Sequence, residues 1–111
     1  MIAKTPQQPY YAVIFTSTRT DGNNGYSEMA AEIETLVEKQ PGFLGYESAR
    51  DKIGITVSYW KDLESIRNWK ENAAHTVARE NGKKSWYENF KVRIARVETD
   101  YVFENENLKK Q

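Results

Sequence analysis

The sequence predicts an α+β domain in which two helices pack against an antiparallel sheet. Segments rich in aromatic and β-branched residues alternate with two segments whose apolar residues recur at helical spacing, in the order strand, helix, strand, strand, helix, strand. The chain has 111 residues, which fits one domain with a single core. We therefore expect one domain over residues 1–111, with its core at 10–103.

The chain up to residue 60 contains four of these six elements. Residues 9–18 are aromatic and β-branched, as in a strand, and turn-forming residues follow at 21–25. A helix is expected from Ser27, a common N-cap residue type, to the breaker Pro41-Gly42. Residues 43–49 and 53–60 then form two strands joined by a short polar turn, which is the pattern of a hairpin.

The second half supplies the remaining helix and strand. Asp62 can cap a helix that carries Ile66 and Trp69 and extends to about Gly82 if nothing breaks it. A last strand is expected at 88–103, followed by a polar, frayed tail at 104–111. The order β-α-β-β-α-β is the ferredoxin-like arrangement.

Both faces of the predicted strands look buried. Tyr11, Val13 and Phe15 point to one side of the first strand, while equally apolar residues point to the other. The last strand changes its apolar phase near Arg96, through a bulge or because both faces are partly covered. Since two helices can cover only one face, we expect a second copy of the chain on the other, in a homodimer packed sheet to sheet.

Composition excludes several classes of function. Sixteen basic residues balance sixteen acidic ones, so no charge pattern points to nucleic acid or to a membrane surface. Cysteine is absent and there is one histidine, which rules out thiolate and multi-histidine metal sites within one chain. No apolar run is long enough to cross a bilayer and no signal peptide is recognisable, so a cytoplasmic protein is expected.

The single histidine, His75, follows Trp69 by six residues and is a candidate general base. In an unbroken helix His75 would point about 180° away from Ile66, into solvent. A break at Asn72, a favoured N-cap residue, could turn its imidazole toward the Trp69 side and lower its pKa. The base hypothesis therefore depends on that break.

Three aromatic residues are candidates for binding a planar ligand. Trp69 faces the sheet by helical phase, where it is either core or the wall of a pocket. Tyr59 could be a further wall, although packing explains it equally well. Trp86 either packs a loop onto the sheet edge or lines the mouth of the pocket.

Several segments together resemble the antibiotic biosynthesis monooxygenase (ABM) domain family. They are Pro41-Gly42-Phe43 before the hairpin, Tyr59-Trp60 at its end, Trp69 on the following helix, and then His75, Gly82 and Trp86-Tyr87. The resemblance covers residues 10–103 and is nearest to small stand-alone bacterial members. It implies a dimeric α+β barrel with a pocket between sheet and helices in each subunit.

Relatives in this family carry out two chemistries. Cofactor-independent monooxygenases oxidise polycyclic phenols, and the resemblance implies that Trp69 belongs to such a site, with His75 where a tyrosine is usual and Ser65 in place of an amide. Haem-degrading members use an Asn on the first strand, which residues 10–18 lack. Our leading hypothesis is a cofactor-independent monooxygenase that acts on a planar aromatic or phenolic molecule. Haem binding and a non-catalytic dimeric ligand-binding module are the alternatives.

Overall fold

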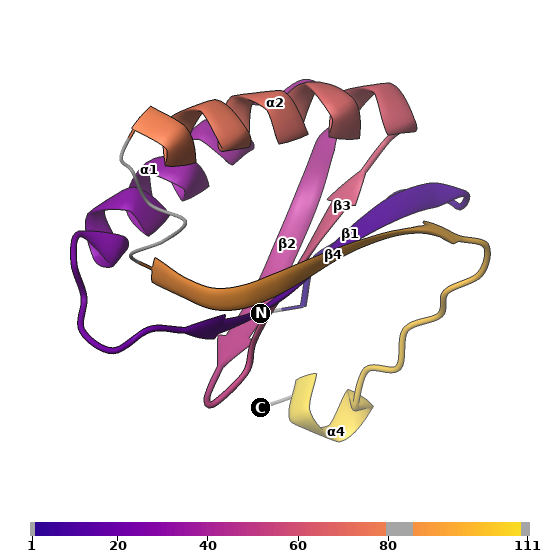
Figure 1. The fold of residues 1–111 in the computed structure, drawn as a ribbon. Coiled ribbons are helices and arrows are strands. Elements are labelled where there is room, and N and C mark those ends of the chain that lie inside the picture. Colours follow the sequence, from indigo (N-terminus) through magenta and orange to yellow (C-terminus); the bar gives the residue numbers. More distant parts are fainter. Residues whose placement is uncertain (1, 80–85, 110–111) are drawn as a thin grey trace.

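A computed structural model of the chain describes residues 2–79 and 86–109. Four antiparallel strands form one sheet: β1 (Tyr10–Arg19), β2 (Phe43–Arg50), β3 (Gly54–Trp60) and β4 (Tyr87–Val97), in the order β2-β3-β1-β4. Helices α1 (Tyr26–Glu38) and α2 (Leu63–Arg79) both lie on one face of this sheet (Figure 1). The β-α-β-β-α-β, ferredoxin-like fold expected from the sequence is confirmed.

The two helices begin with different caps. Asp62 caps α2 as expected, because its Oδ1 accepts the backbone N–H of Ser65 at 2.8 Å. In α1 the expected cap at Ser27 is wrong, because the helix already begins at Tyr26. The cap is shared by Gly25, whose φ is 83°, and by Asn23, whose Oδ1 accepts the backbone N–H of Ser27 at 3.1 Å. Only glycine adopts such a φ readily, and this explains the end of the glycine- and asparagine-rich turn.

Helix α2 continues through Asn72 without a break, so of the two possibilities the unbroken helix is the one observed. The Asn72 side chain is used in a tertiary contact instead, since its Nδ2 donates to Oε1 of Gln40 at 3.1 Å. Its backbone carbonyl accepts the Thr76 hydroxyl at 3.1 Å, one turn further along the same helix. The predicted end of this helix near Gly82 lies outside the described residues.

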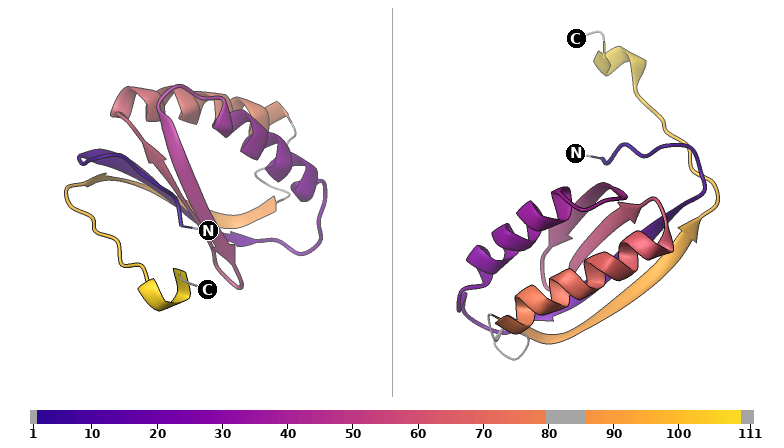
Figure 2. Two further views of the ribbon diagram at one scale, coloured as in Figure 1. Left: turned by 180° about the vertical axis from the view of Figure 1, so that it is seen from behind. Right: turned by 90° about the horizontal axis from the view of Figure 1, so that it is seen from above.

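Strand β4 ends at Val97 and not at 103. Val97 pairs with Tyr10, the first residue of β1, so beyond it β1 offers no backbone to pair with. The apolar phase change near Arg96 therefore requires no bulge, and the irregularity in this ladder lies between Thr18 and Arg19. The following residues leave the sheet, with the side chains of 101–103 exposed, and end in the short helix α4 (Glu106–Lys109) (Figure 2).

The core lies between the two helices and the end of the sheet where β2 and β1 begin and β3 ends. Trp60 is 0% exposed and packs with Val37 of α1 and Ile66 of α2. Its ring stacks on that of Trp69, with centroids 6.1 Å apart, and meets the Phe43 ring edge to face at 5.4 Å. These contacts join both helices to β2 and β3.

The helix-facing side of the sheet can be described as four cross-strand rows, each read from β2 through β3 and β1 to β4. Directly opposed residues on neighbouring strands share a face, which fixes the membership of every row. The rows are Phe43, Trp60, Tyr11, Arg96; then Tyr46, Ser58, Val13, Ile94; then Ser48, Thr56, Phe15, Val92; and last Arg50, Gly54, Ser17, Phe90. The first row carries the core, and the other three have small or polar residues on β3.

Neither α1 nor α2 packs on the opposite side of the sheet, and the tail that ends in α4 extends away from the strands there (Figures 1 and 2). At one end of it Tyr59 donates its hydroxyl to Glu47 at 2.5 Å, and Glu47 also accepts the backbone N–H of Ala3 at 3.0 Å. Tyr10 donates its hydroxyl to Asp100, which ties the start of β1 to the chain beyond β4. Further along, Ile55 is exposed on this face. As expected, the helices cover only one side.

Candidate functional site

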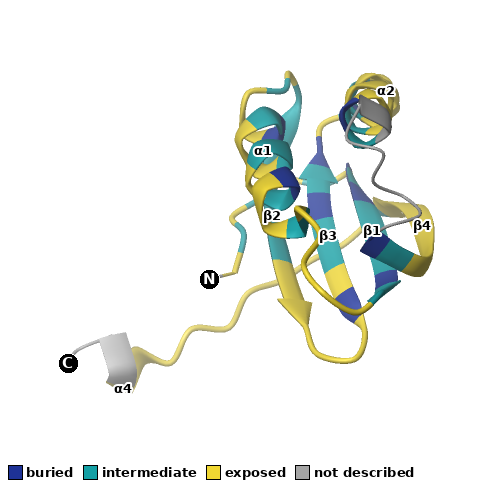
Figure 3. Ribbon diagram, turned by 60° about the vertical axis from the view of Figure 1, so that its left-hand side comes forward, coloured by how far each residue is buried: buried dark blue, intermediate teal, exposed yellow. Residues whose placement is uncertain are grey.

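The candidate site is a strip of apolar side chains on the helix-facing side of β1 and β4. Phe90, Val92 and Ile94 alternate along β4 and are 41%, 45% and 49% exposed. They lie opposite Ser17, Phe15 and Val13 of β1 in the cross-strand rows. Helix α1 packs over β2 and α2 over β3, so β4 runs along the flank of α2 with this side largely uncovered (Figures 2 and 3). We call Val13, Phe15, Phe90, Val92 and Ile94 the β1–β4 apolar surface.

Trp69 lies where this surface meets the core. It faces the sheet, as its helical phase predicted, and is partly buried against the cluster that contains Trp60. Val13 packs against the same cluster and begins the apolar surface. Trp69 is therefore both a packing residue and the aromatic side chain through which α2 can contact a ligand on that surface.

Three aromatic rings gather at the other end of the surface. The Phe15 ring lies 5.6 Å from that of Tyr87 and 5.3 Å from that of Phe90, and the Tyr87 and Phe90 rings are 5.7 Å apart. Burial raises the pKa of Tyr87 far above its usual value, with further contributions from the neighbouring Tyr26. Tyr87 therefore stays a neutral phenol at physiological pH, hydrogen-bonded to Tyr26, and it cannot act as a base.

His75 lies on the exposed side of α2. Because α2 is unbroken, six residues of helix place His75 about 120° around the axis from Trp69. The structure therefore does not bring the two together, and the condition on which the base hypothesis rests is not met.

Tyr59 and Trp86 do not join Trp69 either. Tyr59 is on the opposite side of the sheet, where its ring meets that of Tyr10 at 5.9 Å, because neighbouring residues of a strand point to opposite faces. Trp86 is buried against the start of α1, where its indole N–H donates to the Asn24 carbonyl at 2.8 Å. Of the two interpretations of Trp86, packing describes its position.

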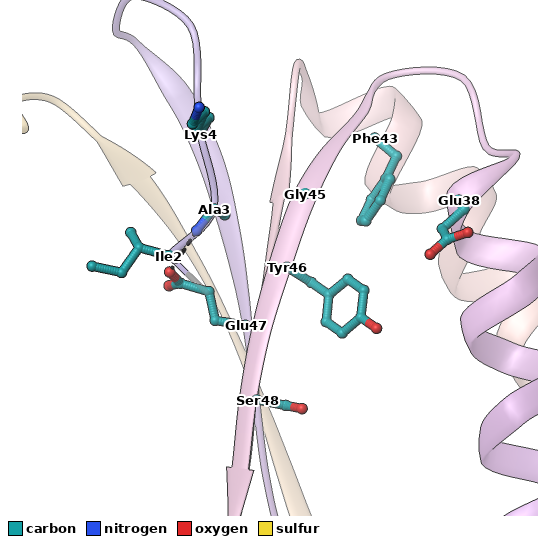
Figure 4. A pocket seen from close by; sticks show the side chains of 9 residues that line it. All are labelled: Ile2, Ala3, Lys4, Glu38, Phe43, Gly45, Tyr46, Glu47 and Ser48. Carbon is teal, nitrogen blue, oxygen red and sulfur yellow. Dashed lines mark hydrogen bonds between the residues drawn. The ribbon is translucent and has the colours of Figure 1, made fainter. Parts of the chain in front are cut away.

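Trp69 lines neither of two shallow hollows, of which the smaller touches the end of the apolar surface at Phe90 and Ser17. The larger, of about 530 Å³, wraps around the outer edge of β2, with Phe43, Tyr46 and Ser48 on the helix side and Glu47 and Ala3 on the other (Figure 4). Tyr46 donates its hydroxyl to Glu34 of α1, and this hydrogen bond raises the pKa of Tyr46 to about 12. The strand itself divides this hollow, which therefore does not form a single binding cavity.

Metal and haem ligands do not assemble in the part of the chain that is described. Within residues 2–79 and 86–109 no three His, Cys, Asp or Glu side chains come close enough to hold a metal ion. A haem on the Trp69 side of α2 would need an axial ligand there, and His75 points elsewhere, so the residues present do not fit the haem alternative. None of the described helices is long and apolar enough to span a membrane.

Of two polar residues beside the apolar surface, Arg50 is not among the candidates that the sequence indicates, and Tyr87 is indicated only together with Trp86. The sequence pattern places Arg50 in the hairpin turn, yet it is the last residue of β2 and continues the alternation of Tyr46 and Ser48 on the helix-facing side. That alternation is the signal that could identify it. Tyr87 follows Trp86 and so suggests loop packing, although it opens β4.

Solved structures share this fold. The chain superimposes on a mutant of SnoaB, a cofactor-independent oxygenase from Streptomyces nogalater, with a TM-score of 0.66 and 10% identity over 82% of this chain and 95% of that one. It matches PA3566 from Pseudomonas aeruginosa with a TM-score of 0.64 and 16% identity over 85% and 97% of the two chains. At these identities the likeness concerns the fold alone.

Sequence comparison identifies the family. The model of the antibiotic biosynthesis monooxygenase family matches residues 9–81, and this chain belongs to that family. The chain is also 46% identical to the uncharacterized protein YqjZ of Bacillus subtilis (strain 168), over 109 residues and 96% of both chains. The family resemblance predicted from the Trp60 and Trp69 segments is thereby confirmed.

Proposed function

We propose that this protein binds a planar aromatic or phenolic small molecule on the β1–β4 apolar surface and oxygenates it without a cofactor. The observation that carries the proposal is that Phe90, Val92 and Ile94, which alternate along β4, are partly exposed on the side of the sheet that bears the helices. Membership of the monooxygenase family and the likeness to SnoaB, described as cofactor-independent, support the choice of reaction.

In this reaction the phenol supplies its own electrons. A phenol and molecular oxygen give a quinone and water, so the step needs no other reductant. The protein contributes position and polarity. Trp69 flanks the ring, the apolar residues of β4 exclude water from one face of it, and the buried, neutral phenol of Tyr87 adds a polar group beside it. His75 has no part in this proposal.

The test is oxygen consumption and quinone absorbance with a dihydroxynaphthalene as probe. Replacing Trp69 with alanine should lower turnover by about tenfold or more, because the ring loses a wall that holds it in place. Asn68→Ala is the matched control, since Asn68 is the exposed neighbour on the same helix and should leave turnover unchanged. Equal turnover in the two variants would exclude Trp69 from the site. Loss of turnover in the His75→Ala variant would contradict this proposal and would assign the role of general base to His75.

A second candidate is a ligand-binding module without catalysis, and the exposure of His75 favours it. In that case the probe would bind to the wild-type protein and would bind more weakly to the Trp69→Ala variant, while neither protein would consume oxygen. The same experiment therefore separates the two candidates.

We further propose that the chain forms a homodimer through the side of the sheet opposite α1 and α2. Apolar residues lie along that side outside the segment covered by the N-terminal residues, among them the exposed Ile55 on β3 and the partly exposed Ile14 on β1. A two-fold axis would bring this surface against its own copy, as closed symmetry requires.

Replacing Ile55 with glutamate should convert the dimer to a monomer in sedimentation-velocity runs, because two like charges would face each other across the apolar interface. Lys52→Glu in the exposed hairpin turn is the control and should remain dimeric. A wild-type protein that sediments as a monomer at every concentration would refute this proposal.

A further inference from the structure

Arg50, an exposed residue at the end of β2, extends its side chain across the sheet toward β1. Its guanidinium donates to the hydroxyl of Ser17 on β1 and, at 3.5 Å, to the Ser17 carbonyl. Between β2 and β1 lies β3, where a Cβ added to Gly54 would stand 2.1 Å from the Arg50 Cζ. The guanidinium therefore occupies the place that a side chain at position 54 would take.

The side chain that fixes Arg50 is itself buried. Ser17 is 1% exposed, and its oxygen atoms are neutral acceptors, so they orient the guanidinium without neutralising its charge. Within the described part of the chain Arg50 forms no ion pair with a carboxylate. Two of its five N–H groups are used by Ser17, and the others remain available to bind an anion.

This charge stands at one end of the β1–β4 apolar surface. Arg50, Gly54, Ser17 and Phe90 form one cross-strand row, and Phe15 begins the next. Tyr87, which contacts both phenylalanine rings, is also close enough to feel the charges of Arg50 and Arg19. The Arg19 guanidinium is already engaged, since its Cζ lies 3.5 Å from the centre of the Tyr26 ring and its Nε donates to the Trp86 carbonyl at 2.9 Å. Of these two described arginines, Arg50 is thus the one whose guanidinium is available to a ligand.

We propose that the ligand of the apolar surface is an aromatic carboxylate, whose ring lies on Phe15, Phe90 and Val92 and whose carboxylate is bound by Arg50. This inference rests on the proposed binding site and narrows its ligand class. A planar guanidinium matches a carboxylate in shape, and one that is already held in place loses little side-chain entropy on binding. Neutral polycyclic molecules would use the same apolar residues but would gain nothing from Arg50.

The test compares two probes with the same ring, naphthol and hydroxynaphthoate, by isothermal titration calorimetry at neutral pH and low ionic strength. Wild-type protein should bind the carboxylate about tenfold more tightly than the neutral naphthol, as one charge-assisted hydrogen-bonded pair allows. Added salt should reduce this preference, because Arg50 lies at the exposed edge of the sheet.

Two variants should abolish the preference in different ways while naphthol still binds. Arg50→Gln removes the charge. Gly54→Ala keeps the charge but forces the guanidinium away from Ser17, and its strand backbone accepts alanine without strain. Arg93→Gln is the matched control, because Arg93 lies on β4 opposite Ile14, on the other side of the sheet; it should keep the full preference.

The outcomes separate this inference from the function on which it rests. Equal affinity of the two probes for wild-type protein would overturn the inference and leave the apolar site in place. If both Arg50→Gln and Gly54→Ala still bind hydroxynaphthoate more tightly than naphthol, another cation binds the carboxylate and the inference is equally overturned. Failure of both probes to bind would overturn the proposed function and the inference with it.

Discussion

Replacing Trp60 with alanine should lower the free energy of unfolding by about 3 to 5 kcal/mol, the largest loss expected for any single substitution in this domain. Trp60 is fully buried at the point where β3 meets both helices, and its ring contacts those of Phe43 and Trp69. Its indole N–H also donates to the Ser58 hydroxyl at 2.9 Å, so the truncation leaves a buried hydroxyl without that partner. Urea denaturation followed by circular dichroism measures the change.

The control for this substitution is Leu63→Ala at the start of α2. Leu63 is half exposed, so its truncation should lower the free energy of unfolding by under about 1 kcal/mol. Both variants must be compared at one protein concentration, because any association would add to the apparent stability. A Trp60→Ala variant as stable as Leu63→Ala would show that the core lies elsewhere.

Replacing Gly42 with alanine should lower the free energy of unfolding by about 2 to 4 kcal/mol, through two separate effects. The φ of Gly42 is +82°, a region that side chains rarely adopt. An added Cβ would also stand 2.1 Å from Oγ and 2.7 Å from Cβ of Ser65, in the first turns of α2. The backbone just before β2 therefore passes too close to α2 for any side chain at this position.

Gly25→Ala separates the two effects. Its φ is +83°, but a Cβ there would meet nothing within 4 Å, so only the backbone strain of about 1 kcal/mol should appear. The difference between the two variants in thermal or urea unfolding then measures the collision with Ser65. If both variants lose the same stability, the close approach of the Gly42 backbone to α2 is not rigid.

The order and the type of the elements followed from the sequence, and the errors concern their ends. Aromatic and β-branched runs identify strands well, because those side chains pack on a pleated sheet. Strand β4 ends at Val97, where β1 can no longer pair with it. The composition of residues 88–103 does not indicate where the partner strand begins. Asn72 likewise has the composition of an N-cap, but a contact with Gln40, distant in sequence, occupies its side chain.

The candidate site was predictable only in part. Helical phase placed Trp69 toward the sheet, since that inference needs nothing beyond the period of one helix. Pairing His75 with Trp69 required a break that local sequence could suggest but not decide. Arg50 escapes sequence reasoning because its importance arises across strands, from a buried Ser17 on β1 and an absent side chain at Gly54 on β3. Such an arrangement can be recognised only once the register of the sheet is known.

The division of the helix-facing side into four rows bears on how such a domain can change over evolution or by design. The residues that hold it together, Trp60 and its neighbours, occupy the first row, while those proposed to meet a ligand occupy the other three. Substitutions at Thr56 or Val92 can therefore reshape what is bound at little expense in folding stability. On the proposed site, one scaffold could thus serve many small molecules, with the ligand preference set by the second, third and fourth rows of the sheet.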